Sequence, residues 1–375
     1  MPRRKGKSKY RIRDVSKLYE EGRDVEDLAA GKSGMGRRGV KLREDRFALS
    51  DEEIDGLPCA EGMVTGLFRG GASVRVDRRE LLCGIAKTFR APEGFSPLAV
   101  GDDVTVALAT PLEEIATEGN KDRADGMILS RQDRRSALIR PRPVGGRVTD
   151  PYRDDPVKQV IAANMDVLLI VASTREPKVR HTTIDRFLIV AEHGEMKPVV
   201  VVNKIDLHKP EERLVAQLHE LSISTVCCSA VTGDGVEELR EILAGKRSVL
   251  AGPSGVGKST LINALIPEAN AATRSVRAKD ERGRHTTSSA VVYDLPDEGL
   301  IVDTPGVREL GIDLQVRDLP WYFPDIAEHA LNCRFNDCTH TIEPQCAVKE
   351  AVEMGRLPQR RYDSYLRILE SLQEQ

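Results

Sequence analysis

Two hydrophobic patterns divide the middle of the chain. From about residue 60 to 147, short stretches alternate apolar and polar residues, as strands with one buried face do. Glycine-rich turns separate five such stretches, which are predicted as strands at 62–68, 72–77, 79–85, 103–108 and 126–130. Five short strands with these turns predict an all-β closed barrel, most simply an OB-fold.

Beyond Pro151 the pattern becomes one of continuous apolar runs separated by helical stretches. The runs are predicted as strands buried on both faces, at 166–172, 198–202, 224–228, 248–251 and 300–302. Helices are predicted between them, at 182–193, 211–221, 236–243 and 260–266. This alternation predicts an α/β domain over about 151–315, with a parallel sheet covered by helices. Ligands of such sheets bind at the carboxyl ends of the strands, so the residues after each run are candidates for a site.

The two ends of the chain differ from this middle part. Residues 1–46 carry seven Lys and Arg residues before the first acidic residue, Asp14, and are predicted to form a basic arm that is disordered when free. Such an arm could contact RNA phosphates or simply keep the protein soluble. Residues 316–375 predict a small, mostly helical domain, with amphipathic helices at 347–354 and 359–372. The predicted architecture is therefore multidomain: arm, OB-fold, α/β domain and C-terminal domain.

The segment that leaves the predicted barrel is rich in arginine. Its members are Arg131, Arg134, Arg135, Arg140, Arg142 and Arg147. Because OB-fold barrels often bind oligonucleotides, this cluster suggests contact with RNA. The alternative is a charged edge that faces only solvent.

The composition of the chain argues against some classes of protein but does not identify a function. The net charge of the 375 residues is -3, which does not by itself indicate a nucleic-acid-binding protein. No apolar run approaches the ~20 residues needed to cross a bilayer, and the charged N-terminus leads into no apolar signal segment. We therefore expect a cytoplasmic, monomeric protein that binds no membrane. Seven cysteines, an odd number in a long chain, do not indicate a disulfide framework.

The fourth apolar run of the α/β part leads into the clearest motif. Its residues are Gly252, Pro253, Ser254, Gly255, Val256, Gly257, Lys258, Ser259 and Thr260. A strand, a GxxxxGK[ST] loop and a helix in this order make a P-loop. Its backbone N–H groups can surround a phosphate, while Lys258 adds a positive charge and the Ser259 hydroxyl can ligate Mg²⁺. The alternative is a glycine-rich turn that binds nothing, which the flanking strand and helix disfavour.

Two other strand ends carry motifs that recognise a base. Asn203, Lys204 and Asp206 form NKxD, in which the aspartate accepts hydrogen bonds from guanine N1–H and the exocyclic amine, a pair of donors that adenine lacks. Asn203 is expected either to contact the other edge of the base or to brace neighbouring loops, and the Lys204 stem to pack on the ring. Ser229 and Ala230 end the next strand, which places the Ala230 N–H to donate to guanine O6.

Two segments after the P-loop have the features of switches that respond to a γ-phosphate. One contains His285, Thr286 and Thr287, and either threonine could complete the Mg²⁺ shell. The other is DxxG, in which Asp303 would hold Mg²⁺ and the Gly306 N–H would sense the γ-phosphate. All these motifs together predict a site for GTP or GDP with Mg²⁺.

A second metal site is predicted near the C-terminus. Its ligands would be Cys333, Cys338, His340 and Cys346. Three thiolates and an imidazole complete a tetrahedral structural zinc site and leave no position open for catalysis. The alternative is a set of free cysteines beside a surface histidine. The other cysteines lack such company and are expected to be small buried residues: Cys59, Cys83, Cys227 and Cys228.

The order of the motifs is circularly permuted. The base motifs come first, then the P-loop and the switch segments, whereas ordinary small GTPases begin with the P-loop. With the preceding barrel and the following zinc module, the chain resembles the ribosome small subunit-dependent GTPase A family over about residues 60–375. The resemblance implies a GTPase that binds the small ribosomal subunit with its rRNA and assists late maturation of that subunit. The cysteine and histidine pattern also matches the family.

The catalytic group is not evident from these motifs. In Ras-type GTPases a glutamine after the DxxG glycine orients the attacking water, whereas here that position is the apolar Val307. His285 is the catalytic candidate, and its alternative is a loop histidine that contacts RNA or solvent. We therefore expect slow hydrolysis that the small subunit stimulates. Another possible function is a GTP-dependent RNA-binding scaffold with negligible hydrolysis; a P-loop kinase has less support, because NKxD and DxxG are GTPase features.

Overall fold

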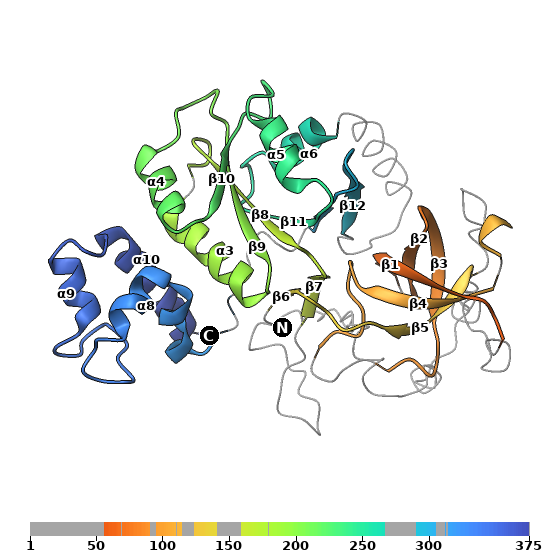
Figure 1. The fold of residues 1–375 in the computed structure, drawn as a ribbon, viewed down its shortest axis with the longest axis horizontal. Helices are drawn as coiled ribbons and strands as arrows, with labels where there is room; N and C mark the ends of the chain where they lie inside the picture. Colours follow the sequence, from red (N-terminus) through yellow and green to blue (C-terminus); the bar gives the residue numbers. More distant parts are fainter. Residues whose placement is uncertain are drawn as a thin grey trace, which may run out of the picture.

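The computed structural model describes most of the chain (Figure 1). The described residues are 56–68, 70–90, 95–109, 111–114, 124–140, 159–178, 180–266, 290–304, 312 and 314–374. The predicted basic arm therefore lies outside them, as do His285, Thr286, Thr287 and Gly306. Figure 1 shows a barrel at one end of the molecule, a sheet with helices in the middle and a group of helices at the other end.

The barrel contains the five predicted strands. They are β1 (Cys59–Phe68), β2 (Gly71–Val76), β3 (Arg79–Ile85), β4 (Asp103–Leu108) and β5 (Gly126–Arg131), and a short 3₁₀ helix, η3 (Leu112–Glu114), follows β4. The strands close in the order β1-β2-β3-β5-β4, with only β3 and β5 parallel among these five. Alternate residues such as Val64, Val74 and Val104 are fully buried in the interior. The prediction of a five-stranded OB-type barrel is confirmed.

A hairpin that the sequence did not predict connects the barrel to the rest of the chain. Its strands are β6 (Ala137–Arg140) and β7 (Gln159–Ala163), which pair antiparallel. Leu138 and Ala162 are buried in it, and Val100 from the barrel side bridges to Ala162. The strands are short and β6 follows an arginine-rich segment, so their hydrophobic pattern is weak.

The middle of the molecule is a six-stranded sheet. Its strands are β8 (Val167–Ser173), β9 (Lys197–Asn203), β10 (Ser224–Cys227), β11 (Arg247–Ala251), β12 (Val291–Asp294) and β13 (Leu300–Asp303). The order is β10-β9-β8-β11-β13-β12, parallel except for the edge strand β12. The parallel sheet is confirmed. The edge strand β12 was not predicted because its apolar run, at 290–293, is short and its residues are only partly buried or exposed.

Four helices connect the parallel strands or follow them. They are α3 (His181–His193), α4 (Glu212–Glu220), α5 (Val236–Leu243) and α6 (Lys258–Leu265). All seven residues of β8 are buried, which explains the unbroken apolar run of its sequence. From β8 the chain runs outward through β9 to β10 and then returns to place β11 on the other side of β8. The strand order therefore reverses between β8 and β11, and open α/β sheets bind ligands at the carboxyl ends of the strands at such a point.

The C-terminal part is helical, as predicted. It contains η5 (Val316–Tyr322), α8 (Pro324–Ala330), α9 (Ala347–Glu353) and α10 (Gln359–Gln373), of which η5 and α8 were not predicted. Helix α10 packs against α3 of the sheet domain. At their contact Arg361, 2% exposed, donates to Asp185 (2.5 Å) on α3 and to Asp325 (2.7 and 2.9 Å) on α8. One buried guanidinium therefore joins three helices.

The barrel is also fastened to the sheet by ion pairs. Asp103 at the start of β4 accepts two hydrogen bonds from Arg247 of β11 (2.9 and 3.0 Å) and one from Asn164 (3.1 Å). On the other side of the barrel, Arg75 contacts Asp294 of β12 at 2.5 Å. The barrel thus contacts both the centre and the edge of the sheet.

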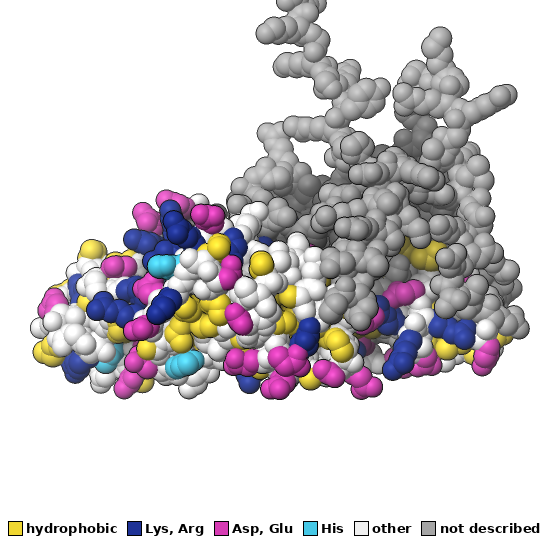
Figure 2. Space-filling model, turned by 90° about the horizontal axis from the view of Figure 1, so that it is seen from above, with side chains coloured by type: hydrophobic (Ala, Val, Ile, Leu, Met, Phe, Trp, Pro, Cys, Tyr) yellow, Lys and Arg dark blue, Asp and Glu magenta, His cyan; other side chains and the backbone are white. Residues whose placement is uncertain are grey.

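The surface of the described residues is charged and carries no long apolar helix. Among the helices of the described ranges, none is long and apolar enough to span a bilayer. On the face seen in Figure 2, Lys and Arg side chains are intermingled with Asp and Glu side chains. Two members of the arginine cluster have buried partners: Arg134 donates to the fully buried Asp102 (2.7 and 2.8 Å), and Arg131 lies 4.0 Å from it. These two arginine side chains are therefore held against the barrel by the Asp102 carboxylate and do not face solvent.

Candidate functional site

The P-loop joins the end of β11 to the start of α6. Gly252 and Gly257 have φ angles of +138° and +96°, which favour glycine. A Cβ atom at position 257 would also collide with the side-chain amide of Asn203. The Lys258 ammonium group donates to the carbonyls of Gly252 (2.7 Å) and Pro253 (2.8 Å). The Lys258 side chain therefore folds back onto the backbone of its own loop and is held there by these two hydrogen bonds.

Asn203 connects three loops at the carboxyl ends of the parallel strands. Its side chain is 2% exposed, its Nδ2 donates to the Val256 carbonyl (3.0 Å), and its Oδ1 accepts from the Ala230 N–H (3.1 Å). The loops after β9, β10 and β11 are thus tied together by one amide. The Ala230 N–H, which the sequence placed against guanine O6, donates to Asn203 in this structure.

Asp206 and Ser229 form a second contact between the same loops. The fully buried Ser229 donates through Oγ to Asp206 Oδ1 (2.6 Å). Asp206 itself is exposed, and within the described residues its second oxygen has no hydrogen-bond partner. The serine therefore orients the carboxylate and leaves one acceptor open. Leu207 and Val231 follow these loops with their apolar side chains exposed, and the sequence analysis did not single them out.

Lys204 bridges the loop after β8 and the P-loop. Its φ angle is +66°, and its ammonium donates to the carbonyls of Glu176 (2.5 Å) and Gly255 (2.8 Å). Thr174 in turn donates through Oγ1 to the Lys204 carbonyl (2.7 Å). The segment 174–178 is therefore part of the site wall, which no motif indicated.

Asp303 lies at the same edge of the sheet. Val249 of β11 pairs with Val302 of β13, so Asp303 is one residue further toward the P-loop. Ser259, in the first turn of α6, has an exposed side chain. These groups together suit a ligand that joins an aromatic base to phosphates and a cation. The oriented Asp206 oxygen and the exposed apolar side chains suit the base, and the glycine-rich loop with its lysine suits the phosphates. Asp303 and the Ser259 hydroxyl suit the cation.

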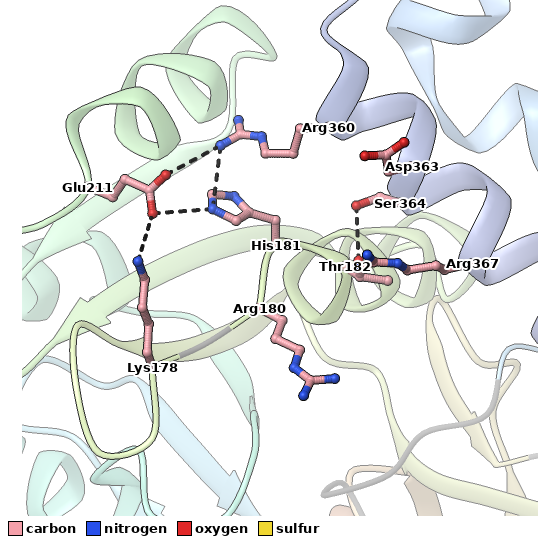
Figure 3. A pocket seen from close by; sticks show the side chains of 9 residues that line it. All are labelled: Lys178, Arg180, His181, Thr182, Glu211, Arg360, Asp363, Ser364 and Arg367. Atoms are coloured by element: carbon pink, nitrogen blue, oxygen red, sulfur yellow. Dashed lines mark hydrogen bonds and ion pairs between the residues drawn. The ribbon is translucent and has the colours of Figure 1, made fainter.

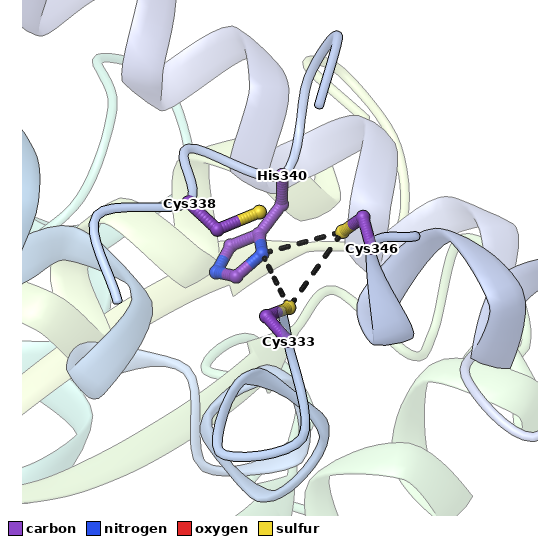
Figure 4. Close-up of side chains that lie close together, drawn as sticks. All are labelled: Cys333, Cys338, His340 and Cys346. Carbon is purple, nitrogen blue, oxygen red and sulfur yellow. Dashed lines mark hydrogen bonds between the residues drawn. The ribbon is translucent and has the colours of Figure 1, made fainter. Parts of the chain in front are cut away.

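The cysteine and histidine cluster is assembled in the C-terminal part (Figure 4). The ligand atoms of Cys333, Cys338, His340 and Cys346 all lie within 4.8 Å of one another. His340 Nδ1 is 3.5 Å from the sulfurs of both Cys333 and Cys346. Tyr362 and Tyr365 of α10 donate to the carbonyls of His340 (2.6 Å) and Thr339 (3.0 Å), which fixes the loop against the helix. The four side chains form a group that could hold a metal ion.

The chemistry of this donor set fits a soft divalent ion. Burial raises the pKa of the Cys338 thiol to about 12 and also raises that of Cys346. Burial lowers the pKa of His340, which favours the neutral imidazole that metals bind. A cation at the centre would offset the desolvation of the thiolates. The remaining cysteines stand apart from this group; Cys83 and Cys228 are buried as expected, while Cys59 is exposed and Cys227 is half-buried.

Comparison with known proteins decides the family. A family model described as RsgA GTPase matches residues 131–313. The small ribosomal subunit biogenesis GTPase RsgA of Chlorobaculum tepidum is 38% identical over 292 residues, which cover 76% of this chain and 89% of the relative. This chain belongs to the RsgA GTPase family. An RsgA protein of Caldanaerobacter subterraneus is also 38% identical, over 316 residues that cover 84% of this chain and 96% of the relative.

Two solved structures have the same fold as this chain. The crystal structure of YjeQ from Thermotoga maritima is 30% identical with a TM-score of 0.61 and covers 85% of this chain and 100% of its own. The structure of YloQ, described as a circularly permuted GTPase, is 26% identical with a TM-score of 0.58 and covers 84% and 96%. The circular permutation is therefore confirmed, and this RsgA family member is a GTPase.

Proposed function

We propose that this protein is a GTP hydrolase that acts as a nucleotide-dependent switch in late maturation of the small ribosomal subunit in the cytoplasm. The observation that carries the proposal is the Asn203 amide, which ties two base-recognition loops to the P-loop and so makes one site of them. The printed names of the relatives, small ribosomal subunit biogenesis GTPases, support the partner: the subunit with its rRNA. The protein would act as a monomer and would not need a membrane.

The loops would divide the nucleotide between them. The open oxygen of Asp206 would accept from guanine N1–H and the amine, and the Lys204 stem would lie along the ring. Guanine O6 would share the Ala230 N–H with Asn203. The backbone N–H groups of the P-loop, which Pro253 lacks, would surround the phosphates. Lys258 would turn from the Gly252 and Pro253 carbonyls to the phosphates, exchanging neutral acceptors for charged ones.

Two metal ions would serve different purposes. Mg²⁺ would be held by the Ser259 hydroxyl, by Asp303 and by Thr286 or Thr287, and would neutralise charge on the phosphates, while the Gly306 N–H would sense the γ-phosphate. Zn²⁺ at Cys333, Cys338, His340 and Cys346 would be structural, because four protein ligands leave no position for substrate. It would hold the loop that carries three of these ligands against the start of α9.

We expect slow GTP turnover by the isolated protein and strong stimulation by purified small ribosomal subunits, with no turnover of ATP. Val307 stands where a water-orienting glutamine is found in other GTPases, so the subunit would have to complete the site. His285→Ala is expected to lose most of the stimulated rate and to keep GTP affinity. Phosphate release measured with and without subunits checks both statements.

The outcomes of this assay separate three cases. Unchanged turnover in the presence of subunits would leave a GTP-dependent RNA-binding scaffold as the better description. Equal stimulation of the parent and of His285→Ala would remove only the catalytic role of His285. Turnover of ATP at the rate of GTP would contradict the assignment of the base site.

Asp206→Asn is expected to weaken GTP binding at least ~tenfold, or ~1.4 kcal/mol. The substitution replaces the open acceptor with an amide that can present a donor to the donors of guanine. Titration calorimetry measures the change. Xanthosine triphosphate carries a carbonyl in place of the amine, so it is the matched probe and should bind the variant better than it binds the parent. Unchanged GTP affinity in the variant would contradict the role of Asp206.

A further inference from the structure

A cavity of about 700 Å³ lies where α3 and α4 meet α10 (Figure 3). Its lining residues are Lys178, Arg180, His181, Thr182, Glu211, Arg360, Asp363, Ser364 and Arg367. The lining includes no residue of the P-loop, although the structure describes all of 252–260. The volume is in the range of small-molecule sites. The hydroxyls of Thr182 and Ser364, 3.2 Å apart, join its two walls.

Positive charge exceeds negative charge around this cavity. Four cationic side chains face two carboxylates. Glu211 is shared between Lys178 (3.4 Å), His181 (3.3 Å) and Arg360 (3.9 Å), and Asp363 already accepts from Gln359 (2.8 Å).

Two of the guanidinium groups around the cavity are not paired with a carboxylate. Across the described ranges, neither the Arg180 nor the Arg367 side chain has a hydrogen-bond or ion-pair partner. Arg180 comes from the segment that leads into α3 and Arg367 from α10, so the uncompensated charges stand on both walls of the cavity.

His181 supplies an unused hydrogen-bonding atom between these walls. Its Nε2 lies 3.3 Å from Glu211 Oε2 and 3.5 Å from Arg360. Its Nδ1 is buried and has no hydrogen-bond partner among the residues that the structure describes. Burial, and then the charge of Arg360, lower the pKa of His181. An anion beside the ring would oppose this shift and accept a hydrogen bond from a protonated Nδ1.

We infer that this cavity is a binding site for a phosphate-bearing ligand. A guanidinium fork matches two oxygens of a tetrahedral oxyanion, and the two unpaired forks with the surplus charge suit a dianion better than a carboxylate. The volume exceeds that of a phosphate group, which leaves room for the organic group that carries it. The terminal phosphate of a nucleotide has this chemistry, whether the nucleotide is free or stands at the end of an RNA strand.

A ligand in this cavity would contact both the C-terminal helices and the sheet domain. Lys178 ends the segment 174–178, whose Glu176 carbonyl is held by Lys204 and whose Pro177 carbonyl accepts from Ser173 (2.6 Å). A ligand held by Arg367 and Arg180 would therefore bridge α10 to the segment beside Lys204. Binding would fix the C-terminal helices to the sheet domain.

The test uses the full-length protein saturated with Mg²⁺ and a non-hydrolysable GTP analogue, so that the P-loop is filled. Inorganic pyrophosphate is then titrated by calorimetry. We expect one further site in the parent, and at least about tenfold weaker binding in Arg180→Gln and in Arg367→Gln. Arg317→Gln, which removes an exposed arginine of η5 outside the cavity, is the matched control and should bind as the parent does.

Failure of the parent to bind pyrophosphate, or equal binding by the parent and both cavity variants, would overturn the inference. A short single-stranded RNA with a 5′-terminal phosphate, added to the complex, identifies the source of the phosphate. Displacement of pyrophosphate by this RNA, but not by the same RNA without the terminal phosphate, supports an RNA end as the natural ligand. Retention of pyrophosphate supports a small phosphorylated molecule.

Discussion

Removal of the metal from Cys333, Cys338, His340 and Cys346 is expected to unfold the C-terminal helices while nucleotide binding remains measurable. Binding of zinc and folding are coupled in small modules, with apparent energies on the order of 10 kcal/mol. The three sulfurs and the imidazole come from a loop and from the start of α9, so a bound metal would join these two segments. Chelation, or Cys338→Ser, should therefore raise hydrogen exchange in α9 and α10.

The single tryptophan makes this result easy to follow. Trp321 lies in η5, in the C-terminal part, so its fluorescence reports on these helices and not on the nucleotide site. Cys59→Ser, which changes an exposed cysteine outside the cluster, is the control and should leave the fluorescence unchanged. Elemental analysis that finds no zinc in freshly purified protein would rule out the proposed ion.

Arg361→Met is expected to destabilise the contact between α10 and α3 by ~3–5 kcal/mol. The arginine lies between Asp185 and Asp325, and Asp185 is only 5% exposed. Methionine fills a similar volume but leaves a buried carboxylate without its counter-charge. Burial already raises the pKa of Asp185, and loss of Arg361 should raise it further. Thermal unfolding followed by Trp321 fluorescence, with hydrogen exchange in α3 and α10, measures the loss.

Two comparisons isolate the buried charge. Arg356→Met removes an exposed arginine whose nearest carboxylate, Glu350, is 3.7 Å away, and should change stability by less than ~0.5 kcal/mol. Adding Asp185→Asn to Arg361→Met should restore part of the loss, because a neutral amide is easier to bury than a carboxylate. Stability equal to that of the parent in Arg361→Met would mean that the ion pairs contribute nothing.

The sequence predicted the elements with a strong hydrophobic period. The continuous run of β8 and the alternating strands of the barrel are buried in the way their patterns indicate. The short strands β6 and β12 escaped prediction because at most one of the four residues in each is buried, and a run of four residues carries little periodicity.

Contacts between distant residues could not be predicted. Arg361 and Asp185 are 176 positions apart, and nothing in either local sequence marks them as partners. Motifs predicted the members of the proposed nucleotide site but not their hydrogen bonds. NKxD left open whether Asn203 contacts the base or braces the loops, and only the fold brings its amide to Val256 and Ala230.

The strand order also decides how the sheet can grow while the chain is being synthesised. Strands β8, β9 and β10 are made first and can pair with one another before β11 and β13 exist. Until β11 arrives, β8 has an open apolar edge, which is the kind of surface that promotes aggregation. In an unpermuted domain the P-loop strand is made first, whereas here it comes late. If the proposed site is the GTP site, GTP would therefore stabilise the nascent domain fully only after synthesis has passed Asp303, when both halves of that site are present.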